Sequence, residues 1–252
     1  MAFYKALENI ELKKYSEANP ESFAVVFYSK ASLKNSSLFD KDMKQKVSTY
    51  FEDEKRTSML LSKELTGDER DILMIKDFDT KKPDHKKYKW LNNIFVGLDK
   101  YGVVAASIYA DTSSLFKNKS FVFDLAKIAE KATYRYTDTN PNTKSEAVLK
   151  TIEICVEKLN ASLGKSVELG FNVGRGANTA RNLGNRPANH ATPTYIANQV
   201  NELAKEIGGF SVEVLEERDM KKLGMGSLLS VSEGSVEPAK LVTMQYKGGK
   251  KD

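Results

Sequence analysis

Apolar residues in the first part of the chain gather into short β-rich runs separated by amphipathic stretches. Residues 23–28 (FAVVFY) form a continuous apolar run, which is typical of a buried strand. After this run, Phe39, Met43, Val47 and Tyr50 recur at helical spacing, with lysines on the opposite face. Strands that alternate with helices predict an α/β layer domain.

The same pattern predicts further strands and a second helix. The predicted strands are 59–61, 72–75, 94–98 and 103–109, with polar turns at 66–68 and 79–84. The predicted helix carries an apolar stripe at Val122, Leu125, Ile128, Ala129 and Ala132.

Residues 138–143 (DTNPNT) form the clearest linker-like break in the chain. Beyond this break, residues 152–156 alternate as a strand does, but a helical stripe through Val148, Cys155 and Leu159 fits equally well. Both interpretations stay open. Either one places Cys155 among apolar neighbours, as a buried structural thiol.

The last third of the chain predicts the start of a second α/β domain. Thr192 is a suitable N-cap and Pro193 suits the first helical position. The helix would bury Ile196, Val200, Leu203 and Ile207 and end at Gly208–Gly209. A strand at 212–214, a short helix at 217–223 and a strand at 241–246 follow. Two strands cannot complete a covered sheet, so we expect one complete domain (1–165) and an incomplete one (166–252).

Composition supports a globular protein. The chain has 252 residues, of which 40% are hydrophobic and 29% charged, which argues against disorder, collagen and a disulfide scaffold. Its one cysteine, Cys155, cannot form an internal bridge and fits a reducing cytoplasm. No apolar run approaches the roughly 20 residues that span a bilayer, and residues 1–15 show no signal-peptide core. We therefore expect a cytoplasmic protein without a membrane partner.

The net charge of +5 permits nucleic-acid contact without requiring it. The densest basic cluster is Lys81–Lys89, which we expect to be a solvated loop. Lysine dominates over arginine, so sequence-specific base readout has little support.

Candidate chemical motifs are incomplete. Residues 174–176 (GRG) lack the third glycine of a dinucleotide loop, and a helix eased by glycine is the better interpretation. His85 and His190 have no partner at metal-ligand spacing, and nothing nearby would activate Cys155 as a nucleophile. The acidic groups Glu216–Glu217 and 52–54 are expected to be solvated. We assign no catalytic, cofactor-binding or metal-binding residue.

Residues 176–249 nevertheless carry a specific series of motifs. In order, they are ARNL (180–183), NRPAN (185–189), TP (192–193), LGMG (223–226), GS (234–235) and YKGG (246–249). This series resembles the opening of the catalytic domain of the leucyl aminopeptidase, or cytosol aminopeptidase, family. Arg186 departs from the pattern, because the family commonly has an acidic residue there.

Upstream, the resemblance is weaker. Residues 129–138 are similar to the helix and turn that close the family's N-terminal domain, and residues 93–98 to its inner strand. The resemblance implies a smaller N-terminal α/β domain, similar to the macro-domain fold, followed by an α/β metallopeptidase domain.

The resemblance also implies a function. Members of the family release N-terminal residues from peptides with two divalent metals, zinc or manganese, and assemble as homo-hexamers. Their metal ligands lie in a stretch that begins with a Gly-Lys-Gly motif and includes an Asp-Ser-Gly-Gly motif, and neither is present in this chain. We therefore carry over no ligand, expect no metal in this chain and expect it to be inactive alone.

Two other interpretations remain. The lysine cluster and net charge are compatible with a DNA-binding, architectural or oligomerisation module, and some bacterial relatives have such a role. A macro-like domain that binds a nucleotide-type phosphate is the third possibility, although no persuasive glycine-rich loop supports it.

Overall fold

The computed structural model describes residues 6–29, 33–34, 39–66, 70–110, 113–139 and 147–248, apart from the side chains of residues 65 and 66. The chain divides into two compact units. The N-terminal unit comprises Lys5–Thr137 and Asn142–Asn178, and the C-terminal unit comprises Met1–Tyr4, Asp138–Pro141 and Thr179–Asp252. The expected boundary between residues 165 and 166 falls inside helix α6 (Ala161–Asn185). The turn predicted at 66–68 and the linker at 138–143 lie largely outside the described residues.

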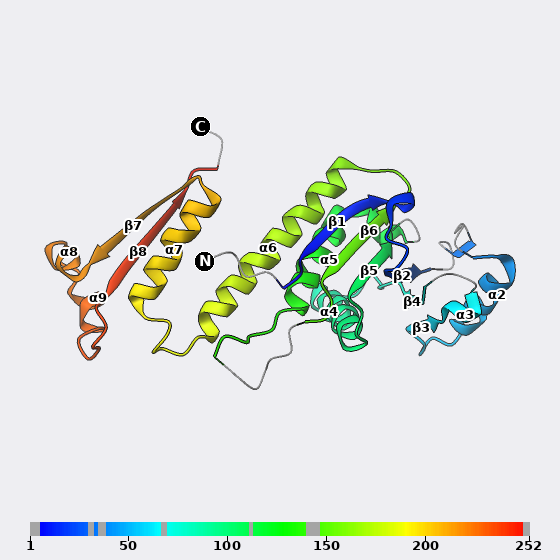
Figure 1. The fold of residues 1–252 in the computed structure, drawn as a ribbon, viewed down its shortest axis with the longest axis horizontal. Coiled ribbons are helices and arrows are strands. Elements are labelled where there is room, and N and C mark those ends of the chain that lie inside the picture. The colour runs from blue at the N-terminus through cyan, green and yellow to red at the C-terminus, as the bar shows by residue number, and fades with distance from the viewer. Residues whose placement is uncertain are drawn as a thin grey trace. The chain divides into compact units, whose positions relative to one another are not determined.

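A six-stranded sheet forms the centre of the N-terminal unit, in the order β1-β6-β5-β2-β4-β3 (Figure 1). All neighbouring pairs are parallel except β3 and β4, which are antiparallel. The strands are β1 (Asn9–Lys14), β2 (Phe23–Tyr28), β3 (Ser58–Leu61), β4 (Ile72–Lys76), β5 (Ala105–Tyr109) and β6 (Thr151–Val156). The structure thus confirms the predicted α/β class and the strands predicted for β2 to β5, and it adds β1, which the sequence did not predict.

Three helices and the sheet enclose the main core of this unit. They are α4 (Asp84–Lys100), α5 (Lys119–Ala132) and α6. Alternate strand residues such as Val25, Ile108 and Ile154 pack with Phe95 and Leu125 in this core. The helix predicted at 122–132 is therefore confirmed.

The strand predicted at 94–98 is wrong, because these residues belong to α4. Leu91, Ile94, Phe95 and Leu98 are all buried, which is the spacing of one helical stripe. A short apolar run does not distinguish a strand from a helix, and the stripe emerges only when Leu91 is included.

The opposite face of the sheet carries a second, smaller core. Val47 of α2 (Lys41–Tyr50) and Phe51 pack there with Val26 and Met74. Asp40 begins α2, since its carboxylate accepts a hydrogen bond from the Met43 amide at 2.7 Å. Helix α3 (Lys63–Thr66) and the short 3-10 helix η1 (Tyr15–Glu17) complete the described elements near this face, and η3 (Ser114–Lys117) precedes α5.

The ambiguous segment 152–156 is a strand. Its even-numbered residues Ile152 and Ile154 belong to the main core, whereas Cys155 belongs to the smaller core. The alternation therefore places Glu153, between the two isoleucines, on the same face as Cys155.

Two glycines allow α6 to approach α5 closely. A Cβ atom at Gly170 would lie 2.2 Å from the carbonyl oxygen of Phe123, and one at Gly174 would lie 2.9 Å from that of Lys127. The segment 174–176 is thus the interior of a helix, as predicted, and not a dinucleotide loop.

The C-terminal unit places helix α7 (Pro193–Ile207) against a hairpin of β7 (Phe210–Glu216) and β8 (Lys240–Tyr246), joined through α8 (Glu217–Lys222) and α9 (Gly226–Ser230). The predicted cap is confirmed, because the Tyr195 amide donates to the Thr192 hydroxyl at 3.1 Å. Gly208, with a φ of 71°, ends α7.

The expectation that α7 buries a full apolar stripe is wrong. Ala197 is its only buried residue, and Ile207 is 43% exposed. The physical reason is that two antiparallel strands form a narrow layer, which cannot cover the whole flank of a helix.

Candidate functional site

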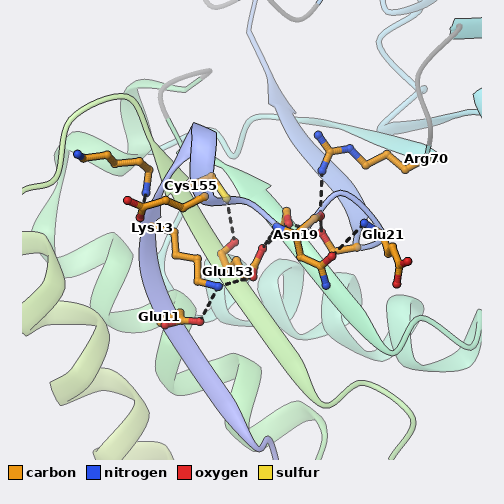
Figure 2. A network of polar contacts seen from close by, with 11 residues as sticks. Glu11, Lys13, Asn19, Glu21, Arg70, Glu153 and Cys155 are labelled. Atoms are coloured by element: carbon orange, nitrogen blue, oxygen red, sulfur yellow. Dashed lines mark hydrogen bonds and ion pairs between the residues drawn. The ribbon is translucent and has the colours of Figure 1, made fainter.

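A buried carboxylate, Glu153 of β6, organises a polar network in the N-terminal unit (Figure 2). Its Oε1 accepts a hydrogen bond from Lys13 Nζ at 2.8 Å. Its Oε2 accepts from the Asn19 amide at 2.9 Å and from Ser107 Oγ at 2.8 Å. Glu153 therefore joins β1, β5 and the connection between β1 and β2.

The network continues through that connection. Ser22 and Ser107 are bonded to each other through their hydroxyls, and Ser22 Oγ also lies 2.7 Å from the Asn19 carbonyl oxygen. Arg70 donates to the same carbonyl oxygen at 3.4 Å and to the Tyr109 hydroxyl. The turn around Asn19 is thus held from several sides.

Electrostatic interactions favour the charged forms of Glu153 and Lys13. Burial raises the pKa of Glu153, but hydrogen bonds from Lys13, Asn19 and Ser107 outweigh it and the net pKa is lowered. Hydrogen bonds to Glu153 and Glu11 raise the pKa of Lys13 well above its usual range. Glu153 and Lys13 are consequently an ion pair at neutral pH.

This arrangement suits support and not catalysis. Ser22 and Ser107 are 1% and 0% exposed, so no substrate reaches their hydroxyls. Both oxygens of Glu153 already accept hydrogen bonds, and its lowered pKa opposes a role as a general base near pH 7. The network fixes the segment 15–22 over the sheet.

Cys155 lies beside this network and is fully buried. Burial, followed by the charge of Glu153, raises the pKa of its thiol to about 11. The thiol stays protonated at neutral pH, and its complete burial confirms the environment predicted for a structural thiol.

Two further buried carboxylates hold chain segments without regular structure. Glu130 of α5 accepts from the amides of Ala6 and Leu7, both at 2.9 Å, and from Asn178 Nδ2 at 3.1 Å. Burial raises the pKa of Glu130 despite these bonds. Glu130 was not predicted from the sequence, although its place beside Ala129 in the apolar stripe of α5 was a signal.

Asp99, at the end of α4, holds the approach to β6. Its Oδ1 accepts from the amides of Val148 and Leu149 at 2.6 and 3.0 Å, and its Oδ2 from Arg135 at 2.6 Å. These bonds fix residues that precede Glu153 in the chain. No sequence motif marks Asp99.

The lysine cluster is not the solvated loop that was expected. Lys86, Lys87 and Lys89 belong to α4. Lys87 pairs with Asp124 at 2.7 Å and Asp84 at 3.0 Å, and these bonds raise its pKa although burial opposes them. The remaining lysines of the cluster, Lys81, Lys82, Lys86 and Lys89, are exposed.

The acidic residues Glu216 and Glu217 are less solvated than expected, since they hold the β7–β8 hairpin. Both oxygens of Glu216 accept from Lys240 Nζ at 2.7 Å, and Glu217 accepts from the Ala239 amide at 2.9 Å. Glu52, Asp53 and Glu54 are exposed, as expected.

Arg186, the departure from the family pattern, has a partner of opposite charge. It forms an ion pair with Asp138, and its guanidinium lies 5.1 Å from the centre of the Tyr195 ring. Asn182 donates to the same carboxylate at 3.1 Å. These contacts give Arg186 a structural role.

Within the described part of the chain, no three His, Cys, Asp or Glu side chains gather as metal ligands. His85 lies in the first turn of α4, and His190 lies in the turn between α6 and α7. None of the described helices is long and apolar enough to cross a membrane.

Together these features define a mixed α/β protein with a largely parallel sheet and a structural polar network. The fold matches that of a tomato leucine aminopeptidase variant, with a TM-score of 0.69 and 13% identity over 96% of this chain and 51% of that one. Leucyl aminopeptidase from Trypanosoma cruzi matches with a TM-score of 0.64 and 14% identity over 98% and 50% of the two chains. The bottromycin maturation enzyme BotP, in complex with Mn, has a TM-score of 0.62 and 15% identity over 90% and 45%.

Residues 178–252 match the profile of the cytosol aminopeptidase family, catalytic domain. A probable cytosol aminopeptidase of Thioalkalivibrio sulfidiphilus is 56% identical over 77 residues, which cover 31% of this chain and 16% of that relative. One of Nitrosococcus oceani is 39% identical over 127 residues, or 49% and 25% of the two chains. The resemblance identified from the sequence is confirmed, and the match spans a quarter or less of these relatives.

Proposed function

We propose that this chain is a portion of a leucyl-type aminopeptidase, which releases N-terminal amino acids from peptide substrates. The observation that carries the proposal is the family match of residues 178–252, with 56% identity to one relative over 77 residues. The leucine aminopeptidase fold over 96% of the chain supports it. The N-terminal unit would then support a catalytic domain whose opening segment begins near Asn178.

The proposal includes two bound zinc or manganese ions, a cytoplasmic location and homo-hexameric assembly. When bound, the two metals would supply Lewis-acid activation of the scissile carbonyl and a nucleophilic water. The described residues offer no group of three ligand side chains, so they do not fit a metal centre. We therefore place no catalytic step on residues of this chain.

A peptidase assay tests the proposal. The 252-residue chain should release no leucine from leucyl amide with added zinc or manganese, whereas a longer coding product that adds the Gly-Lys-Gly and Asp-Ser-Gly-Gly motifs should do so. Robust release of leucine by the purified 252-residue chain would contradict the expectation that the metal ligands are absent from this chain. A longer product that binds metal yet hydrolyses no peptide would contradict the aminopeptidase assignment.

Nucleic-acid binding is a second candidate, favoured by the exposed Lys81, Lys82, Lys86 and Lys89 near the start of α4. Duplex DNA should bind at low salt and dissociate steeply as salt rises, because each phosphate contact releases counterions. Exchange of Lys86 and Lys89 for glutamate should abolish binding. The same exchange of Lys41 and Lys46 on α2 is the control. The absence of binding at low salt would remove this candidate.

A further inference from the structure

The carboxyl group of Asp77 is bound on one side only. Asp77 follows β4, and its amide donates to the Tyr28 carbonyl oxygen at 2.8 Å, which fixes the residue beside the end of β2. Its Oδ2 accepts a hydrogen bond from Ser113 Oγ at 2.8 Å. Its Oδ1 is buried and accepts no hydrogen bond from the residues that the structure describes. A buried polar atom without a partner is unfavourable, and most of all when the group carries a charge.

Among the described residues, no opposite charge compensates for this burial. The ionisable residues on the neighbouring elements are Tyr28 of β2, Lys76 of β4, Tyr109 of β5, Asp84 and His85 of α4, and Lys117 of η3. None of them shifts the pKa of Asp77, which burial raises to about 6 and which the hydrogen bond from Ser113 lowers only in part. In the described structure the carboxyl group is therefore neutral below about pH 6, whereas a solvated aspartate ionises near its ordinary pKa of 3.8.

Ser113, the one side-chain partner of Asp77, begins a segment that depends on this bond. Ser113 Oγ also accepts from the Leu115 amide at 3.1 Å and so caps η3. Leu115 and Phe116 are buried in the main core. The hydrogen bond between Asp77 and Ser113 thus ties residues 113–118, which we call the η3 segment, to the end of β4.

We propose that Asp77 is a pH-sensitive switch, which holds the η3 segment against β4 when its carboxyl group is neutral and loosens this segment when it is ionised. Opening of the segment lets water reach the carboxylate, so the ionised group gains the hydration that the closed segment denies it. The proton is bound more tightly by the closed state and therefore favours closure. Since Oδ1 is buried inside the N-terminal unit, its surroundings change only when this unit opens.

The equilibrium constant for opening should rise with pH. Asp77 has a pKa of about 6 in the closed state and its ordinary value of 3.8 once solvated. Because the closed state binds the proton more tightly, opening is least favoured below about pH 4 and levels off above about pH 6. Between pH 4 and pH 7 the equilibrium constant for opening should increase about fiftyfold.

Amide hydrogen exchange of the 252-residue chain measures this opening. The amides of Leu115, Phe116 and Asn118 are hydrogen-bonded within the η3 segment and report its closed state. Their protection factors, corrected for the intrinsic exchange rate, should fall about fiftyfold from pH 4 to pH 7. At each pH they should also stay below the protection factors of the β2 amides, which marks a local opening. Equal protection at pH 4 and pH 7 would overturn the proposal, and so would protection equal to that of β2, which indicates global unfolding.

Asp77→Asn is the discriminating variant, because it keeps an oxygen for Ser113 and cannot ionise. Its protection factors in the η3 segment should agree within about twofold at pH 4 and pH 7. Asp79→Asn removes the same charge at an exposed position two residues away and should keep the fiftyfold fall. His85→Asn should keep it as well, and this control is needed because histidine ordinarily titrates in the same range. If Asp77→Asn retains the fall, or if either control loses it, Asp77 is not the switch.

Ser113→Ala tests the connection between Asp77 and the η3 segment. Without the hydroxyl, both the bond to Asp77 and the cap of η3 are lost, so protection of the segment should fall at least about fivefold even at pH 4. Ser114→Ala, at the exposed neighbouring position, is the matched control. Equal protection in the two variants would contradict the connection. These experiments measure local opening and not hydrolysis, so their outcome is independent of the proposed peptidase function.

Discussion

The Glu153 network makes a quantitative prediction about stability. Glu153→Gln keeps the size of the side chain and an oxygen for the Asn19 amide and Ser107 Oγ, but its amide group cannot accept from Lys13. The variant loses the charge-assisted hydrogen bond of 2.8 Å between Lys13 and residue 153, whose side chain is only 5% exposed. Breaking a buried pair costs about 3 to 5 kcal/mol. The Lys13 side chain is 26% exposed and keeps Glu11 at 3.0 Å, so we expect a smaller loss than this, about 2 to 3 kcal/mol.

Urea unfolding followed by circular dichroism measures this loss, with Glu21→Gln as the control. Glu21 is exposed in the same segment, and its exchange should change the free energy of unfolding by less than about 0.5 kcal/mol. Lys13→Met completes a double-mutant cycle, and we expect a coupling energy of at least about 1 kcal/mol. If Glu153→Gln is as stable as Glu21→Gln, or if no coupling is found, the network does not hold the segment 15–22.

The stabilisation by Glu153 should also depend on pH. Its folded pKa lies below the usual carboxyl value, so the folded state favours the ionised form. This contribution is present above the unfolded pKa and is lost as pH falls through the folded pKa. The stability difference between wild type and Glu153→Gln should therefore shrink in acid. A difference that grows in acid would contradict the direction of the shift.

Three more predictions concern groups outside this network. Burial raises the pKa of Asp77 to about 6 from 3.8, so ionisation of Asp77 destabilises the folded state as pH rises. The stability of Asp77→Asn relative to wild type should therefore increase by about 2 to 3 kcal/mol from pH 4 to pH 7, and a constant difference in urea unfolding would refute this. Gly174→Ala should destabilise the chain by about 1 to 3 kcal/mol, because the added methyl group would meet Lys127 and Glu130. Gly176→Ala, where nothing lies within 4 Å, should stabilise the chain by about 0.5 to 1 kcal/mol. Equal changes in the thermal stability of the two variants would contradict the close approach of α6 to α5. Cys155 should not react with a thiol reagent at pH 8 until the protein unfolds, and rapid labelling of the native chain would disprove its burial.

The sequence predicted those elements whose pattern is local. The run 23–28 and the Thr192 cap were identified because apolar continuity and a side-chain hydroxyl act within a few residues. The error at 94–98 has the same origin, since a five-residue window hid the stripe that begins at Leu91. The local pattern of apolar residues predicted an element correctly only where the stretch of sequence considered covered the whole element.

The polar network could not be predicted in this way. Glu153 lies between two buried isoleucines, and alternation places it on the opposite face of the sheet without showing that a second core covers this face. Its burial depends on Lys13 and Asn19, which lie 140 and 134 residues away in the chain. Long-range contacts of this kind leave no periodic signal in one sequence. The family resemblance did not help either, because the matching segment begins at residue 178.

Three of the buried carboxylates, Glu153, Glu130 and Asp99, share one physical role. Glu153 accepts from the Asn19 amide, Glu130 from the Ala6 and Leu7 amides, and Asp99 from the Val148 and Leu149 amides, so each holds a connecting segment against a helix or strand. Buried carboxylates with shifted pKa values often mark active sites. In this chain their acceptor oxygens are already bonded to backbone amides and other protein donors, and none is more than 9% exposed, which leaves no position for a substrate. The distinction between support and catalysis therefore depends on the partners of the carboxylate and its access to solvent, and by both measures Glu153, Glu130 and Asp99 have a structural role.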